Sequence, residues 1–212
     1  MTPPSDTPHF REEKEFHRQG FLLVAGVDEA GRGALAGPVV AGAVILSQCR
    51  RCGWLKDVRD SKLLPAEARE ELYEVITAEA AGYGAGIVSH AYIDAHGIVA
   101  ATRLAMKLAI EELSPRPQAL LIDFLRLPAF ALPQKGIVDG DALCVSIACA
   151  SIVAKVTRDR LMRRIDGRYS GYGLAQHKGY GTPEHLGRLT ELGPSHIHRR
   201  SFAPVANLKT LL

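Results

Sequence analysis

Short, almost wholly apolar runs alternate with glycine-rich or charged stretches along the first two thirds of the chain. Residues 21–27 (FLLVAGV) and 38–46 (PVVAGAVIL) are too short for three helical turns, which favours two buried strands. Residues 83–90 and 119–122 are further strand candidates, and 136–138 is a short extended piece. The pattern therefore predicts a central sheet built from widely spaced segments.

Apolar residues at helical spacing fill most of the remaining chain. They predict helices over 65–82, over 92–113 with a stop at Ser114–Pro115, and over 142–165. Thr182–Pro183 opens a last helix that Gly193–Pro194 closes. This order predicts a mixed α/β protein in which helices cover a central sheet.

The length and composition support one compact domain. We predict a loose N-terminal arm over 1–15, with helical character near 12–19, and one domain over 16–212 with C-terminal helices from about 160. No apolar stretch reaches the ~20 residues needed to span a bilayer, and the polar start has no signal-peptide core, so we expect a cytoplasmic protein. The net charge of +3 permits a polyanionic partner without requiring one.

The four cysteines do not form a zinc-binding pattern. Cys49 and Cys52 make a C-x-x-C, but Cys144 and Cys149 have a different spacing and lie in an apolar helix. The C-x-x-C does not open a helix after a strand, as thiol oxidoreductases require. We predict four free thiols.

Carboxylates follow or head three of the apolar segments. Asp28 and Glu29 come at the exit of the first strand, Asp123 at the end of 119–122, and Asp141 near the start of the long helix. Isolated strand-end acids usually only solvate the chain, but adjacent strands would gather these acids. Crowded carboxylates suit hard divalent cations, and two such ions about 4 Å apart activate water at a phosphodiester. The cluster predicts phosphoryl chemistry.

The same stretches resemble one known family. VDEAGRGALAGPVVAGAVIL from Val27 is similar to the signature of bacterial ribonuclease HII, the type 2 ribonucleases H. Further similar stretches occur in the family's order and together cover about residues 20–205. They are DSKLL from Asp60, ALLID from Ala119, GDALCVSIACASIVAKVTRDRLM from Gly140, HKGYGTPEH from His177, and HRRSFAPV from His198.

The resemblance implies a ribonuclease H-like fold: a mixed central sheet flanked by helices, with a helical C-terminal segment. It implies an endonuclease that cuts the RNA strand of RNA/DNA hybrids. It also implies cleavage 5′ of single ribonucleotides in duplex DNA, leaving a 3′-hydroxyl and a 5′-phosphate, as in ribonucleotide excision repair. The residues that match the family's four acids, which hold two Mg²⁺ or Mn²⁺ ions, are Asp28, Glu29, Asp123 and Asp141.

Other matched residues imply substrate contacts. Gly31, Arg32 and Gly33 match a G-R-G element that senses the ribose 2′-hydroxyl, where glycine lets the backbone approach a sugar. Tyr180 matches a tyrosine that stacks on the following sugar. The residues that fit phosphate contacts are Ser61, Lys62, Ser151 and Lys155. The competing interpretation is helix packing for Ser151 and a solvated helical lysine for Lys155. His177 and Lys178 could face phosphates in the same way.

Two positions depart from the family pattern. Phe124 stands where relatives usually have glycine or alanine, which predicts either tighter surroundings of Asp123 or a differently placed loop after it. Asp139 stands where they commonly have lysine, so we predict weaker substrate affinity or a stronger metal requirement. A monomer suffices for this chemistry, and a sliding-clamp docking tail like those of some relatives is not evident after HRRSFAPV.

Two other functions are alternatives to an endonuclease. A nucleotide-binding phosphotransferase would cradle phosphate in the glycine loop, but the loop lacks the G-x-x-x-x-G-K-[ST] form and begins with acids. A non-catalytic hybrid-binding protein would tolerate loss of the acids, yet all four are present. A cleavage assay separates these alternatives.

Overall fold

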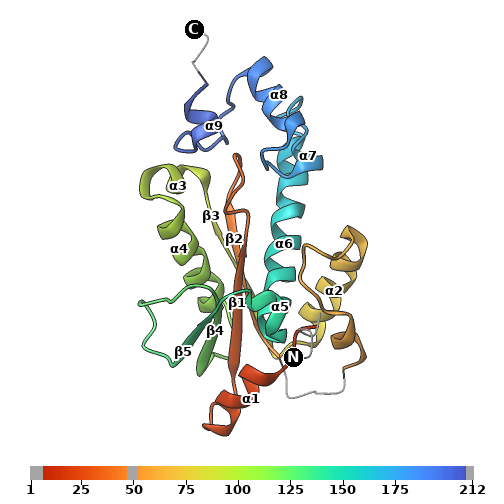
Figure 1. Ribbon diagram of the computed structural model, residues 1–212, viewed down its shortest axis with the longest axis vertical. Helices are drawn as coiled ribbons and strands as arrows, with labels where there is room; N and C mark the ends of the chain where they lie inside the picture. The colour runs from red at the N-terminus through yellow and green to blue at the C-terminus, as the bar shows by residue number, and fades with distance from the viewer. Residues whose placement is uncertain (1–6, 47–51, 209–212) are drawn as a thin grey trace, which may run out of the picture.

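A five-stranded mixed sheet forms the centre of the molecule, in the order β3-β2-β1-β4-β5. The computed structural model describes residues 7–46 and 52–208. Helices cover both faces of the sheet (Figure 1). The strands are β1 (Val24–Ala30), β2 (Val39–Ile45), β3 (Gly82–Val88), β4 (Ala119–Asp123) and β5 (Gln134–Ile137). This architecture confirms the predicted mixed α/β fold.

The register of β1 on β4 places two acids at the same level. The strands are parallel, and Val27 pairs with Ile122, so the next residue on each strand is an aspartate, Asp28 and Asp123. Strand β2 runs antiparallel to β1 and to β3, and β5 runs parallel to β4. Because the carboxyl ends of parallel strands meet at one edge of a sheet, the acids converge there.

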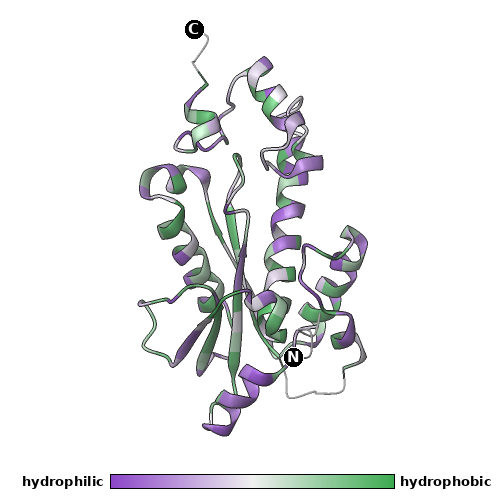
Figure 2. Ribbon diagram, viewed as in Figure 1, coloured by the Kyte–Doolittle hydropathy of each residue, from purple (hydrophilic) through white to green (hydrophobic). Residues whose placement is uncertain are grey.

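The helices form two layers around the sheet. They are α1 (Arg11–Arg18), α2 (Ala66–Glu79), α3 (His90–His96), α4 (Ile98–Glu111), α5 (Gly140–Leu143), α6 (Val145–Asp166), α7 (Leu174–His177), α8 (Pro183–Leu192) and α9 (Ala203–Ala206), with a short 3₁₀ helix, η1 (Gly53–Asp57). Helix α4 packs on one face, and α6 with α2 packs on the other. Figure 2 shows apolar residues gathered on the strands and on the inner helix faces, whereas α1 is almost wholly hydrophilic.

Glycines in the sheet allow the helices to pack against its backbone. A Cβ on Gly26 of β1 would lie 2.1 Å from the carbonyl carbon of Ser146, and one on Gly42 of β2 would lie 2.2 Å from the carbonyl oxygen of Ala150. Both contacted residues belong to α6, whose residues 145–154 are all buried. The glycine positions in 21–27 and 38–46 thus reflect contact between α6 and the sheet rather than turns.

The last part of the chain, residues 167–208, packs on the turn between β1 and β2. A small apolar core joins the two, including Leu35 and Ala36 of the turn with Leu174 and Ile197. Backbone hydrogen bonds add to it: Leu35 N–H donates to the Gly179 carbonyl at 2.7 Å and Arg199 N–H to the Leu35 carbonyl at 2.8 Å. This segment therefore holds the loop that follows the β1 acids.

Several predicted boundaries were wrong. Strand β1 begins at Val24 and runs to Ala30, so Asp28 and Glu29 lie within it and not at its exit. The helix predicted over 92–113 is two helices, because Gly97 adopts a φ of 81° between them. The helix predicted over 142–165 is interrupted at Cys144, which has an extended conformation, and α9 follows the helix predicted as the last.

Helix α1 crosses residue 15, where the predicted arm ends. Its Glu13 is buried and accepts hydrogen bonds from Ser146 N–H at 2.9 Å and the Cys144 thiol at 3.1 Å. A carboxylate at the first turn of α6 stabilises that helix end. Cys144 and Cys149 are buried free thiols, whereas Cys49 lies outside the described residues. None of the described helices is both long and apolar enough to span a membrane.

Candidate active site

Three carboxylates meet at the end of β1 and β4. Oxygens of Asp28, Glu29 and Asp123 all lie within 4.8 Å of one another, as the parallel register requires. Asp28 is buried with only 4% of its surface exposed, and the other two are half-buried. The predicted convergence of these acids is confirmed.

The cluster is electrostatically unfavourable without a cation. Burial, followed by repulsion from Glu29 and Asp123, raises the pKa of Asp28 well above its ordinary value. Burial also raises the pKa of Glu29, although Arg32, whose Nη1 lies 3.2 Å from Glu29 Oε1, opposes the shift. The pKa of Asp123 is raised by burial as well. Each carboxylate therefore gains stability from a neighbouring positive charge.

The donor set fits a hard divalent cation. All three residues offer carboxylate oxygens, and no histidine or cysteine belongs to the group. Glu29 Oε2 is buried and has no hydrogen-bond partner among the described residues. A buried carboxylate oxygen without a partner is costly, and a metal ligand bond would satisfy it. The residues present thus fit the ions that the sequence predicts.

Asp141 lies beside this cluster rather than within it. It is buried in α5, and the preceding Gly140 N–H donates to Asp123 Oδ1 at 2.8 Å. Lys62 Nζ lies 3.1 Å from Asp141 Oδ2. The fourth predicted acid is therefore adjacent to the other three and carries a lysine as its counter-charge.

A cavity of about 240 Å³ opens over the acids. It brings together eleven of the twelve residues predicted for the site, with Asp141 the exception. The lining residues are Asp28, Glu29, Ala30, Gly31, Arg32, Gly33, Ser61, Lys62, Asp123, Ser151, Lys155 and Tyr180. Segments far apart in the sequence thus form one continuous surface.

Two serines link the DSK element to the acids. The hydroxyls of Ser61 and Ser151 lie 2.9 Å apart, and both residues are buried. A hydrogen bond from Ser151 lowers the pKa of Asp28, against the larger effect of burial. The serines therefore orient Asp28, and their contact with a phosphate stays a prediction.

Lys155 and Tyr180 also line the cavity. Lys155 Nζ pairs with the buried Asp159 carboxylate at 2.7 Å, and only 19% of the lysine side chain is exposed. It also lies 5.7 Å from the centroid of the Tyr180 ring. A freely solvated lysine is excluded by this geometry, and the half-buried tyrosine ring is held at the cavity by two cations, since Arg158 lies 5.2 Å from its centroid.

Two buried arginines, Arg199 and Arg158, contact the glycine loop that follows β1. Arg199 donates to the carbonyls of Gly31 and Arg32, both at 2.8 Å. Arg158 packs so closely on Gly31 that a Cβ there would lie 1.9 Å from Nε of the arginine, and Gly31 has a φ of 90°. Sequence reasoning missed both arginines, although each lies in a stretch quoted for its resemblance.

His177 and Lys178 are not among the residues that line the cavity, and their contact with phosphates stays a prediction. The His177 ring is buried, with Nε2 2.7 Å from the Tyr172 carbonyl and Nδ1 accepting from Gly179 N–H at 3.2 Å. Lys178 bonds carbonyls of its own turn, including that of Gln176 at 3.2 Å. Both residues shape the HKGY turn that presents Tyr180.

A chain of buried histidines supports the same tyrosine. His185 Nδ1 lies 2.9 Å from the Tyr180 carbonyl, which can only accept, so Nδ1 donates. In the neutral ring His185 Nε2 then accepts from His198 Nε2 at 3.0 Å, and His198 Nδ1 accepts from Ser195 at 2.8 Å. This arrangement requires both rings to be neutral.

We therefore expect unfolding to depend on pH. Burial, with His185 as a further cause, lowers the pKa of His198 from 6.5 to about 4. The unfolded chain binds the proton first, so stability is complete above about pH 6.5 and falls by up to roughly 3 kcal/mol as the pH drops to about 4. Urea unfolding of wild type and of His198→Gln across this pH range measures the change in the free energy of unfolding. If the free energy of unfolding changed equally with pH in the two proteins, the neutral state assigned to His198 would be contradicted. The control is His196→Gln, a substitution at an exposed histidine.

Phe124 adopts a backbone conformation that suits glycine. Its φ is 56° and 63% of its surface is exposed. Since the left-handed region is unfavourable for bulky residues, Phe124→Gly should stabilise the fold by about 0.5–1 kcal/mol. Phe124→Ala keeps the strain while removing the ring. If thermal unfolding showed Phe124→Ala to be as stable as Phe124→Gly, or more stable, strain at this positive φ would not be the cause.

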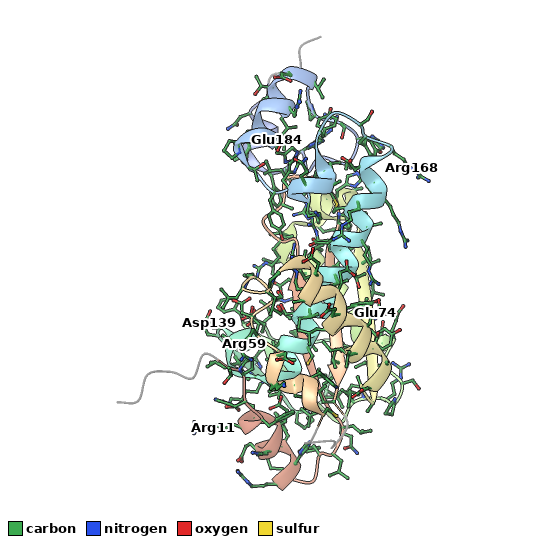
Figure 3. The ribbon with its side chains drawn as sticks, turned by 90° about the vertical axis from the view of Figure 1, so that its right-hand side faces the viewer. Arg11, Arg59, Glu74, Asp139, Arg168 and Glu184 are labelled. Carbon is green, nitrogen blue, oxygen red and sulfur yellow. The ribbon has the colours of Figure 1, made fainter. Side chains whose placement is uncertain are left out.

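Asp139 is exposed at the periphery of the molecule and heads α5 (Figure 3). Its charge raises the pKa of Asp123, as a smaller contribution after burial. We expect Asp139→Lys to change the metal concentration needed for half-maximal cleavage and to increase the salt sensitivity of substrate binding. Metal and salt titrations of cleavage measure both, and two unchanged dependences would refute the effect.

Comparison with known proteins agrees with this geometry. The ribonuclease HII family model matches residues 25–205. Ribonuclease HII of Dehalococcoides mccartyi strain 195 is 56% identical over 206 residues, covering 97% of this chain and 98% of the relative. The crystal structure of ribonuclease H2 from Pyrococcus horikoshii superposes with a TM-score of 0.71 at 27% identity, covering 86% of this chain and 95% of that one. Ribonuclease HII of Archaeoglobus fulgidus, in a structure with PCNA, gives 0.73 at 27% identity, covering 85% and 95%. The chain thus belongs to the ribonuclease HII family and is a ribonuclease H, an endonuclease.

Proposed function

We propose that this ribonuclease H cleaves the RNA strand of RNA/DNA hybrids and also cuts 5′ of single ribonucleotides in duplex DNA. The products would carry a 3′-hydroxyl and a 5′-phosphate, and the reaction would serve ribonucleotide excision repair. One observation carries the proposal: the acid cluster and the loop Gly31–Gly33 line the same cavity. A group that recognises a ribose would then lie beside the groups that act on its phosphodiester.

The acids would hold the divalent ions. Asp28, Glu29 and Asp123 are grouped closely enough to share one ion, and Asp141 is adjacent for a second. When bound, two Mg²⁺ or Mn²⁺ ions supply Lewis acidity, which activates water and stabilises the leaving oxygen. The serine pair and the Gly140 N–H keep Asp28 and Asp123 oriented for this task.

The other cavity residues would bind and position the duplex. Backbone groups of Gly31–Gly33 approach the ribose, because Gly33 is exposed and carries no side chain. Tyr180 offers a ring face for the neighbouring sugar, and Lys155 and Lys62 offer cations for backbone phosphates. Such contacts fix the duplex without reading base sequence, so cleavage should depend on the ribose and not on the base.

The two rival functions fit the cavity less well. A phosphotransferase would bind anionic phosphate at a loop whose entrance carries Asp28 and Glu29, which repel it. A non-catalytic hybrid-binding protein has no use for buried acids that raise one another's pKa. The relation to the sliding clamp stays a prediction, because residues 209–212 lie outside the described residues.

Three labelled duplexes test the proposal. They share one sequence and differ only in one strand, which is all RNA, DNA with one ribonucleotide, or all DNA. With Mg²⁺ or Mn²⁺ we expect cleavage of the first two, and a single cut 5′ of the ribonucleotide in the second. A polymerase should extend the new 3′ end directly. Equal cleavage of the all-DNA duplex, or products that need phosphatase before extension, would refute the proposal.

A further inference from the structure

Arg199, in the C-terminal segment, is a fully buried cation. Its side chain has no solvent-exposed surface, and it forms no ion pair with any residue that the structure describes. Its guanidinium instead donates to three carbonyls of the loop after β1: Gly31 and Arg32, both at 2.8 Å, and Gly37 at 3.0 Å. Burying a charge is costly unless hydrogen bonds compensate it, so the arginine is committed to this loop.

These bonds fix the direction of two peptide groups. In a trans peptide the C=O and the following N–H point in opposite directions. Because the carbonyls of Gly31 and Arg32 point inward to Arg199, the N–H groups of Arg32 and Gly33 point away from it. Both residues line the cavity, and neither N–H donates to another residue in the described part of the chain. The lining of the cavity thus contains two N–H donors that have no acceptor among the described residues.

Only an arginine satisfies this arrangement. The planar guanidinium presents several N–H donors in a fixed fork, whereas a lysine ammonium is a compact point charge. The fork is also held in place by the Phe202 ring, whose centroid lies 5.1 Å from Arg199 Cζ. Arg158 donates to the Ala36 and Pro38 carbonyls, at 3.1 and 2.9 Å, on either side of Gly37. Both arginines thus hold the loop in place.

We propose that Arg199 is a positioning residue for ribose recognition: by holding the Gly31 and Arg32 carbonyls, it aims the Arg32 and Gly33 N–H groups at the ribose. The inference rests on the proposed function, because it concerns how the same cavity distinguishes ribose from deoxyribose. Arg199 itself does not touch the substrate. It links the C-terminal segment to the loop, so that segment contributes to selectivity and not to stability alone.

The test measures binding rather than cleavage. The affinity of the full-length protein is determined in Ca²⁺ for a DNA duplex with one ribonucleotide and for the matching all-DNA duplex. We expect wild type to prefer the ribonucleotide, and Arg199→Lys to reduce that preference by about fivefold for each hydrogen bond that is misdirected. Its affinity for the all-DNA duplex should stay unchanged. A wild type without any preference refutes the proposed function, whereas a preference kept in Arg199→Lys refutes only the role of Arg199.

Two further variants complete the test. Arg200→Lys makes the same change at the exposed neighbouring residue and should keep the wild-type preference. If Arg199→Lys does not fold, Phe202→Leu carries the test, since it leaves Arg199 in place but removes the ring beside its guanidinium. A preference reduced at least twofold with native thermal stability supports the role of Arg199. An unchanged preference overturns it.

Discussion

Replacing Asp28 with asparagine is expected to stabilise the metal-free protein while it abolishes cleavage. Burial raises the pKa of Asp28, and repulsion from two neighbouring carboxylates raises it further. Asparagine keeps the shape and removes the charge, so we expect a gain of about 1–2 kcal/mol in EDTA. Cleavage should fall at least about 100-fold, because metal-ion stabilisation is worth several kcal/mol.

Thermal unfolding with and without Mg²⁺ checks the stability part. Mg²⁺ should raise the melting temperature of wild type, because an ion that binds only the folded state stabilises it. The same Mg²⁺ concentration should raise the melting temperature of Asp28→Asn much less. Asp57→Asn is the control, since it makes the same charge change at an exposed residue outside the cluster. A lower melting temperature of Asp28→Asn in EDTA, or an equal Mg²⁺ response, would contradict the assignment.

The substitution Gly26→Ala is expected to destabilise the fold by about 3 kcal/mol or more. Its new methyl group would lie 2.1 Å from the Ser146 carbonyl carbon and 2.3 Å from the carbonyl oxygen. Those are backbone atoms of α6, so no side chain can move aside. Helix α6 would have to shift away from β1, and the shift would also displace Ser151 from Asp28.

Urea unfolding compares this variant with Gly187→Ala. Gly187 lies in α8, and a Cβ there would meet nothing within 4 Å. Alanine is the better helix former, so Gly187→Ala should stabilise by about 0.5–1 kcal/mol. Similar effects of the two substitutions would show that the close packing of α6 on β1 does not limit stability.

The strands that carry Asp28 and Asp123 could be predicted from the sequence because they depend on local patterns. Apolar runs that lead into Asp28 and Asp123 indicate strands that carry acids, whatever the order of the sheet. The pairing that brings them together could not be predicted in this way. Strands β1 and β4 are neighbours although about 90 residues separate them, and their register follows from packing against α4 and α6. The breaks at Gly97 and Cys144 likewise come from tertiary packing, which overrides helical periodicity.

The residues that hold the loop after β1 could not be predicted from the sequence for a different reason. Arg199 and His198 belong to a basic stretch that ordinarily indicates a solvated surface, yet both are fully buried or nearly so. Their partners are backbone carbonyls and another histidine, and neither kind of partner leaves a sequence pattern. The left-handed conformation of Phe124 likewise leaves no sequence pattern, since glycine or asparagine would be the usual signal.

Single-turnover cleavage by a doubly substituted protein tests the central claim most directly. The protein carries Asp28→Asn and Asp123→Asn, and its substrate is the DNA duplex with one ribonucleotide, in Mg²⁺ and in Mn²⁺. The account predicts that wild type cuts 5′ of the ribonucleotide, whereas the double variant still binds the duplex but gives no product above the protein-free control. Product at a rate near that of wild type would contradict the claim that these acids hold the ions that cleave beside the ribose.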